Sequence, residues 1–89
     1  MSREAERAVE RALETWALTQ GGVRLVRVRR STGRGGAGLA CANPARRPPH
    51  ATGRKRWIVT TERLETLREE RAYVCEECAA ALAARPASR

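Results

Sequence analysis

The sequence predicts a small α+β domain, and three local patterns within its 89 residues lead to that prediction. Residues 5–17 repeat apolar side chains at the spacing of a helix, near 3.6 residues. Two later runs, residues 23–30 and 56–60, are rich in β-branched residues and favour strands. Finally, Cys75 and Cys78 form a Cys-x-x-Cys pair at the start of an alanine-rich segment. We therefore expect helices at both ends and a short β-hairpin between them.

The N-terminal segment, residues 1–22, is predicted to be an amphipathic helix that ends at Gly21 and Gly22. Its apolar side chains fall on one helical face: Ala5, Ala8, Val9, Ala12, Leu13, Trp16 and Ala17. The simplest interpretation is that this face packs on the rest of the domain. The alternative is that residues 5–17 form the interface with a protein partner or a second copy of the chain.

The next part of the chain is predicted to be a strand followed by a long basic loop. In the strand over residues 23–30, one face carries Val26 and Val28, and the other carries Val23 and Leu25 followed by Arg27 and Arg29. Four glycines in residues 31–38 and the prolines near residue 48 then predict a loop. The chain returns to an extended conformation at residues 56–60.

After the second strand, Thr61 is expected to cap a short helix in which Leu64 and Leu67 face inward. A short extended run over residues 72–74 leads into the final helix, which runs to about residue 85. The expected order is therefore helix, strand, basic loop, strand, helix, strand and helix. We assign residues 23–85 to one basic module and residues 86–89 to a tail.

The two cysteines of the Cys-x-x-Cys pair can both reach one tetrahedral metal ion. Their place in the first turn of a helix stabilises thiolates, because free backbone N–H groups and the helix dipole lie there. This strand–Cys-x-x-Cys–helix, residues 73–84, resembles the C-terminal half of a treble-clef or zinc-ribbon-like zinc finger. The resemblance implies a treble-clef-like fold, a structural Zn²⁺ ion, and Cys75 and Cys78 as ligands.

The first half of the chain departs from that family pattern. Cys41 has Pro44 where a second cysteine would stand, and His50 is the only other strong ligand in the chain. A set made of Cys41, His50, Cys75 and Cys78 would be a Cys₃His site, for which the intervening loop must fold back. Three alternatives remain open: a zinc site completed by water, Glu76 or a partner's residue; a dithiol redox pair; and three free, buried thiols.

A metal would matter for the stability of this chain. It contains no Phe and only three aromatic residues, so its core is poor in large side chains. Small domains of this kind usually need disulfides, a metal or a partner.

The charge distribution points to a polyanionic partner. Between Thr15 and Thr61 there are ten basic residues and no acidic ones, whereas each flanking segment has a net charge of −1. Nucleic acid is the commonest partner of such a block. The residues predicted to bind it are Arg27, Arg29, Arg30, Arg34, Arg46, Arg47, Arg54, Lys55 and Arg56. Trp57, beside the last three, can stack on a base, but we favour a place in the core.

Taken together, these observations predict a small zinc-stabilised module that binds DNA or RNA, or associates with a nucleoprotein complex, as an accessory or regulatory factor. The alternative is a protein–protein adaptor that docks on an acidic surface of a transcription or translation machine. An enzyme is not expected, because the chain has no Asp, one His and no nucleophile–base set. The odd number of cysteines and the lack of a long apolar stretch favour a cytoplasmic protein without a membrane span.

Overall fold

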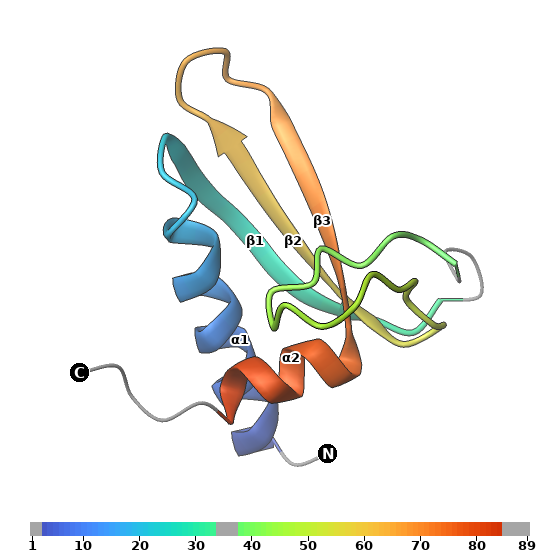
Figure 1. The fold of residues 1–89 in the computed structure, drawn as a ribbon. Coiled ribbons are helices and arrows are strands. Elements are labelled where there is room, and N and C mark those ends of the chain that lie inside the picture. The colour runs from blue at the N-terminus through green and yellow to red at the C-terminus, as the bar shows by residue number, and fades with distance from the viewer. Residues whose placement is uncertain (1–2, 34–37, 85–89) are drawn as a thin grey trace.

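In the computed structural model, which describes residues 3–33 and 38–84, two helices pack against a three-stranded antiparallel sheet (Figure 1). The elements follow the chain in this order: α1 (Arg3–Leu18), β1 (Val23–Ser31), β2 (Arg56–Arg63), β3 (Glu69–Cys75) and α2 (Glu76–Ala83). The strand order is β1-β2-β3, so β2 is central. The prediction of a small α+β domain is confirmed at this level.

The hydrophobic core lies between the two helices and one face of the sheet. Its most deeply buried side chains come from all of these elements: Val9, Leu13 and Ala17 of α1, Trp57 and Val59 of β2, Val74 of β3, and Cys78 and Ala79 of α2. The apolar face of α1 therefore packs within the domain. Trp57 is 2% exposed, which confirms that its indole belongs to the core.

β1 has a β-bulge that changes which residues face the core. Leu25 pairs with Thr61 and Arg27 with Thr60, so Val26 is an extra residue. Leu25 and Val28 consequently both pack on the core, while Val26 is 41% exposed. The predicted pairing of Val26 and Val28 on one face was wrong, because a strict two-residue alternation takes no account of a bulge.

The helix predicted after Thr61 is absent from the described residues, and a β-hairpin stands in its place. β2 continues to Arg63 and pairs with β3 through Glu62 and Glu69. The turn between the strands closes with the N–H of Arg63 donating to the Arg68 carbonyl at 2.9 Å. Leu64 and Leu67 are 56% and 68% exposed, so they do not face inward. Pairing of the central strand along its full length outweighed the weak helical spacing of two leucines.

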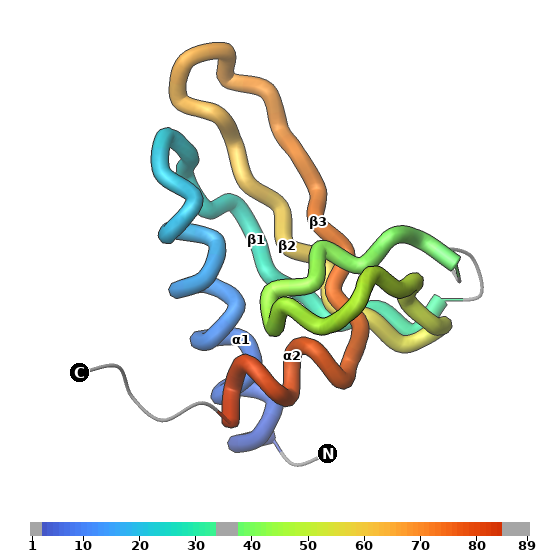
Figure 2. Tube along the Cα trace, viewed as in Figure 1, coloured from blue at the N-terminus to red at the C-terminus, as the bar shows by residue number. Residues whose placement is uncertain are grey.

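The loop between β1 and β2 lies against the end of β3 and over the start of α2, as the tube in Figure 2 shows. The N–H of Ala42 donates to the carbonyl of Tyr73 at 2.7 Å, and this bond joins the loop to the outer edge of β3. Neither described helix is long and apolar enough to cross a bilayer.

Candidate metal centre

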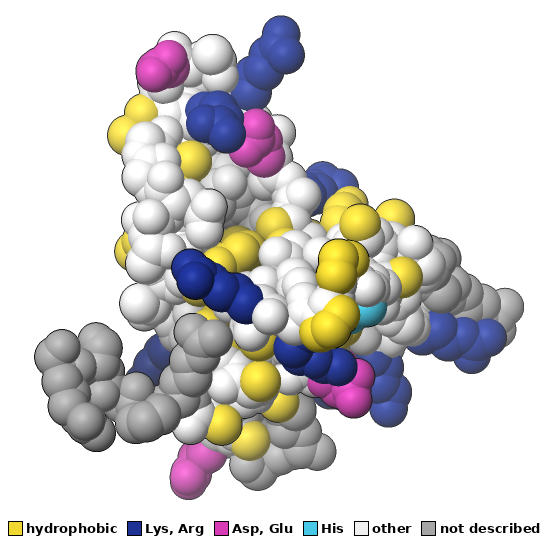
Figure 3. Space-filling view, in the orientation of Figure 1, with side chains coloured by type: hydrophobic (Ala, Val, Ile, Leu, Met, Phe, Trp, Pro, Cys, Tyr) yellow, Lys and Arg dark blue, Asp and Glu magenta, His cyan; other side chains and the backbone are white. Residues whose placement is uncertain are grey.

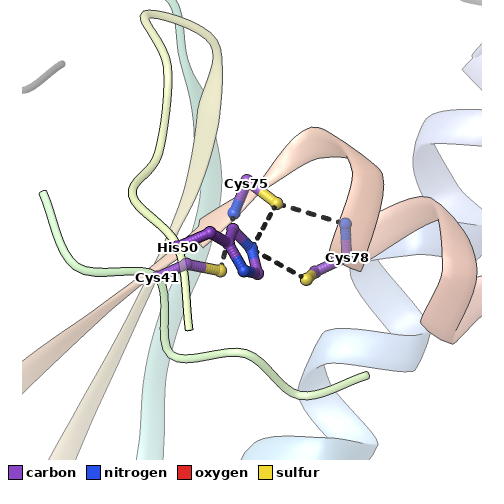
Figure 4. Close-up of side chains that lie close together, drawn as sticks. All are labelled: Cys41, His50, Cys75 and Cys78. Carbon is purple, nitrogen blue, oxygen red and sulfur yellow. Dashed lines mark hydrogen bonds between the residues drawn. The ribbon is translucent and has the colours of Figure 1, made fainter. Parts of the chain in front are cut away.

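Four side chains that can bind a metal converge where the loop meets β3 and α2. Cys41 and His50 come from the loop, Cys75 ends β3, and Cys78 lies in the first turn of α2 (Figure 4). One ligand atom from each residue lies within 4.8 Å of all the others. His50 Nε2 is 3.3 Å from the Sγ atoms of both Cys75 and Cys78. These four residues are the ligand set predicted from the sequence, and the fold brings them together.

The loop reaches this geometry by folding back on itself. The N–H of Cys41 donates to the His50 carbonyl at 3.0 Å, and Ala40 and Ala51 form an antiparallel bridge. The N–H of Thr52 donates to the Leu39 carbonyl at 2.7 Å. These bonds bring Cys41 and His50 side by side although eight residues separate them in the sequence.

The imidazole of His50 is oriented by the loop backbone. Its Nδ1 lies 2.8 Å from the Pro48 carbonyl, which can only accept a hydrogen bond, so Nδ1 carries the proton when the ring is neutral. Nε2 is then left with a free lone pair that is directed at the cysteine sulfurs. Backbone fixation of one ring nitrogen is the usual arrangement for a histidine that binds a metal through the other.

Backbone N–H groups donate to two of the three sulfurs, those of Cys41 and Cys75. Cys41 Sγ accepts from the backbone N–H of Asn43 at 3.3 Å and of Cys75 at 3.4 Å. Cys75 is the N-cap of α2, and its Sγ accepts from the N–H of Cys78 at 3.3 Å. Because such bonds are strongest to a charged acceptor, they favour thiolates over thiols.

The pKa values of Cys41, Cys78 and His50 reflect these contacts. Partial burial acts against ionisation of Cys41, but the N–H groups of Cys75 and Asn43 outweigh it and lower the pKa of that thiol. Burial raises the pKa of Cys78 to about 11, and the neighbouring sulfurs of Cys75 and Cys41 add to this rise. The hydrogen bond to Pro48 raises the pKa of His50. A thiol proton therefore remains on Cys78 at neutral pH until a cation replaces it.

The donor set fits a zinc ion. Zn–S bonds of about 2.3 Å in a tetrahedron require sulfurs about 3.8 Å apart, which is compatible with a cluster of this size. Among the common metals of proteins, zinc is one that thiolate and imidazole ligands favour. Glu76, the alternative fourth ligand, instead accepts a hydrogen bond from Arg30 Nε at 2.9 Å. The cluster is thus a possible zinc site that needs no ligand from outside the chain.

Arg47 lies beside the cluster. Its Nη1 is 3.8 Å from Cys78 Sγ, and its Nη2 is 3.7 Å from a carboxylate oxygen of Glu77. The backbone of Arg47 is held by Asn43, whose side chain accepts from the Arg47 N–H at 2.9 Å and donates to its carbonyl. The neighbouring residue, Arg46, is exposed and has a positive φ of 58°. Only one of these two adjacent arginines contacts the metal ligands.

Two other cations predicted to bind nucleic acid are held within the fold. Arg30 forms ion pairs with Glu6 of α1 and Glu76 of α2, so it links three elements. Arg56 is 7% exposed, and its Nη1 donates to the Arg54 carbonyl at 3.1 Å. The prediction for Arg34 lies outside the described residues.

The remaining predicted cations are exposed: Arg27, Arg29, Arg46, Arg54 and Lys55. Arg27 and Arg29 lie on the sheet face that points away from α1. Arg71 of β3 lies on the same face, since it is in register with Thr60, which pairs with Arg27. Arg71 was not among the residues predicted from the sequence to bind nucleic acid. The alternation of polar and apolar side chains over residues 71–74 is a strand signal that indicates its face.

Comparison with known proteins adds no relative to this description. No family model matches the chain, and no curated protein or solved structure matches it significantly. The treble-clef resemblance is thus supported only by the Cys₃His cluster, and the function must be argued from the residues themselves.

Proposed function

We propose that this chain is a zinc-stabilised module that binds nucleic acid, as an accessory factor rather than an enzyme. The observation that carries the proposal is the distribution of ion pairs. Ten exposed cations form no salt bridge with any described residue, and six of them lie on the sheet or in the loop between β1 and β2: Arg27, Arg29, Arg46, Arg54, Lys55 and Arg71. Uncompensated charge of one sign attracts a polyanion and is screened by salt.

The metal centre supports a structural rather than a catalytic role. Cys41, His50, Cys75 and Cys78 supply four ligands, which completes the tetrahedron that structural zinc sites prefer. Catalytic zinc sites keep one position open for water or substrate. In our proposal, zinc fixes the loop to β3 and α2, and the chain's own arginines make the contacts with the ligand.

Salt dependence tests the nucleic-acid proposal. We expect the zinc-loaded chain to bind fluorescently labelled, mixed-sequence DNA or RNA in an anisotropy titration, and to bind more weakly as salt rises. Log K should fall with log salt at a slope of about −0.9 for each phosphate contact on duplex DNA. Affinity that does not change between about 50 and 200 mM salt would contradict the proposal.

Two variants on the same strand sharpen that test. Arg29→Gln removes an unpaired cation, so it should reduce the magnitude of the salt slope by about one contact. Arg24→Gln is the matched control, because the Arg24 guanidinium is already 2.8 Å from a Glu62 oxygen. We expect a smaller change in slope for the control.

The adaptor alternative uses the same cations against an acidic protein surface. It has lost part of its original support, since Val9, Leu13 and Ala17 of α1 are buried within the domain. The two hypotheses differ in one observation made during purification. A nucleic-acid binder retains nucleic acid at low salt, visible in its absorbance ratio and removed by nuclease, whereas absence of both retained nucleic acid and oligonucleotide binding would favour the adaptor.

A further inference from the structure

We infer that the binding surface is the open face of the β-sheet and that its ligand is single-stranded nucleic acid; this inference rests on the proposed function. Both helices pack on the opposite face, where the core lies. Figure 3 views the molecule from the side of the loop and α2, where hydrophobic side chains gather and the basic side chains are scattered. On the other face of the sheet, three arginines of β1 and β3 line one hollow.

Strand register places these residues in two adjacent rows across the sheet. One row consists of Arg27, Thr60 and Arg71, which are consecutive cross-strand partners. The next row consists of Arg29, Ile58 and Tyr73. Cross-strand partners have Cβ atoms about 5 Å apart, so three arginines surround a threonine, an isoleucine and a tyrosine in a compact patch. We call these six residues the sheet-face patch.

The sheet-face patch contains a hollow of about 190 Å³. It is separate from another hollow, of about 350 Å³, which lies beside α1. The hollow is lined by the three arginines, Ile58 and Thr60 of the patch, and by two further residues, Val26 and Glu69. Ile58 is only 7% exposed, which makes it an apolar floor rather than an edge. The hollow thus combines an apolar floor with a largely cationic rim.

This combination fits a single strand better than a duplex. A duplex presents phosphates on its outside and keeps its bases stacked inside, so the apolar floor and the half-buried Tyr73 would have no partner. A single strand presents both phosphates and unstacked bases. Arginine guanidinium groups and aromatic rings stack on such bases, and guanidinium groups also bind phosphates. The patch is also the face of a three-stranded sheet, whereas a major groove admits a helix or a two-stranded ribbon.

Charge also limits the path that a single strand of nucleic acid can take across the sheet. The row beyond Arg27 and Arg71 is acidic: Glu62 pairs with Glu69 across the strands, and Arg24 is already bound to Glu62. At the opposite end of the sheet, Arg54 and Lys55 directly precede β2. A polyanion is therefore favoured from that end up to the Arg27–Arg71 row and disfavoured beyond it.

The first test compares two triple variants with the same change in charge. One replaces Arg27, Arg29 and Arg71 with Gln, and its control replaces Arg3, Arg7 and Arg11, which are exposed on α1, with Gln. The probe is a labelled, mixed-sequence DNA strand of about 12 nucleotides, within the range of known single-strand sites. We expect the sheet-face variant to lose at least tenfold in affinity and the α1 variant to lose much less.

The second test removes the aromatic ring. Tyr73→Ala should weaken binding of the single strand by roughly 5- to 150-fold without changing the salt slope, as loss of one stacked base does. Tyr73→Phe keeps the ring and should bind almost as well as the wild type. Melting temperature and bound zinc are measured for every variant. Should the triple variant fail to fold, the single Arg27→Gln variant on the edge strand provides the same comparison.

The outcomes separate this inference from the proposed function. If the wild type binds no nucleic acid, the proposed function fails. Equal losses for the two triple variants, tighter binding of the duplex than of the single strand, or no effect of Tyr73→Ala would each overturn the sheet-face inference while leaving the proposed function standing. Binding to an acidic protein but not to oligonucleotides would replace both with the adaptor hypothesis.

Discussion

The basic residues between Thr15 and Thr61 differ in their roles, although they carry the same charge. A zinc ion bound by three thiolates and one neutral imidazole leaves the site with a net charge of −1. Arg47 is beside Cys78, and Arg56 is the cross-strand partner of Cys75. Arg56 is buried, and its Nε has no hydrogen-bond partner among the described residues. A buried cation without a carboxylate is costly, so the anionic metal site offers a physical reason for its position.

The first residue-scale prediction concerns Arg47. Arg47→Gln removes a cation 3.8 Å from Cys78 Sγ, so the thiolate loses charge compensation. We expect zinc to be lost to a competing chelator several times faster, with partial rescue by Arg47→Lys. Arg46→Gln is the control, because the Arg46 side chain has no hydrogen bond or ion pair with the ligands in the described part of the chain and should keep the wild-type rate. Equal rates for Arg46→Gln and Arg47→Gln would refute a role for Arg47 at the metal centre.

A second residue-scale prediction follows from the pKa of Cys78. Burial raises that pKa to about 11, so the thiol is protonated at neutral pH and zinc must displace its proton. The raised pKa of His50 adds a further competing proton in mildly acidic solution. Zinc affinity should therefore increase as pH rises and decrease as pH falls. Calorimetry in buffers of different ionisation enthalpy should report proton release at pH 7; a heat independent of the buffer would contradict this.

Among the elements, the β2–β3 hairpin differs most from the sequence-based prediction. Leu67 in its turn has a φ of 58°, a left-handed conformation that is unfavourable for leucine. Leu67→Gly should thus stabilise the domain by about 1 kcal/mol, because glycine adopts this conformation without steric strain. Leu64→Gly is the control, since Leu64 is also an exposed residue of this segment, at 56% against 68%, but has no positive φ.

Thermal or urea unfolding measures both hairpin variants. In the helix that the sequence favoured, glycine at either position would instead cost about 1 kcal/mol. The sign of the Leu67→Gly effect therefore distinguishes the two structures of this segment. A loss of stability for both variants would support the helix.

Local features of the elements could be predicted from the sequence, whereas features that depend on distant contacts could not. The spacing of Cys75 and Cys78 and the periodicity of α1 are local, and both were predicted from a few neighbouring residues. The bulge at Val26 and the extension of β2 depend on pairing with strands distant in the sequence. The ion pairs of Arg30 with Glu6 and Glu76 are equally non-local. Sequence analysis therefore identified the candidate ligands but did not separate the structural arginines from the free ones.

At the scale of the whole molecule, the metal centre is joined to the core. Cys78 is both a candidate ligand and a fully buried core residue, and it packs in the same cluster as Val9 and Leu13 of α1. The two helices also contact each other through this region, so fixing Cys78 fixes the place where α1 docks. Loss of the metal is therefore expected to affect the whole fold rather than the loop alone.

The final prediction tests this dependence by removing zinc. Structural zinc contributes about 10–16 kcal/mol in small zinc-finger peptides, which matches or exceeds the net stability of about 5–15 kcal/mol of most domains. Chelation, or the Cys75→Ser variant, should abolish most of the helical far-UV circular dichroism and the cooperative melting transition. Ala79→Ser is the matched control, because it places the same hydroxyl at a fully buried position of α2 but leaves all four ligands intact. It should keep a cooperative transition at a lower temperature. An unchanged melting temperature for Cys75→Ser would contradict the metal centre. It would mean that the cysteine sulfurs pack as ordinary core atoms, because loss of one ligand would destabilise a fold that depends on a bound metal.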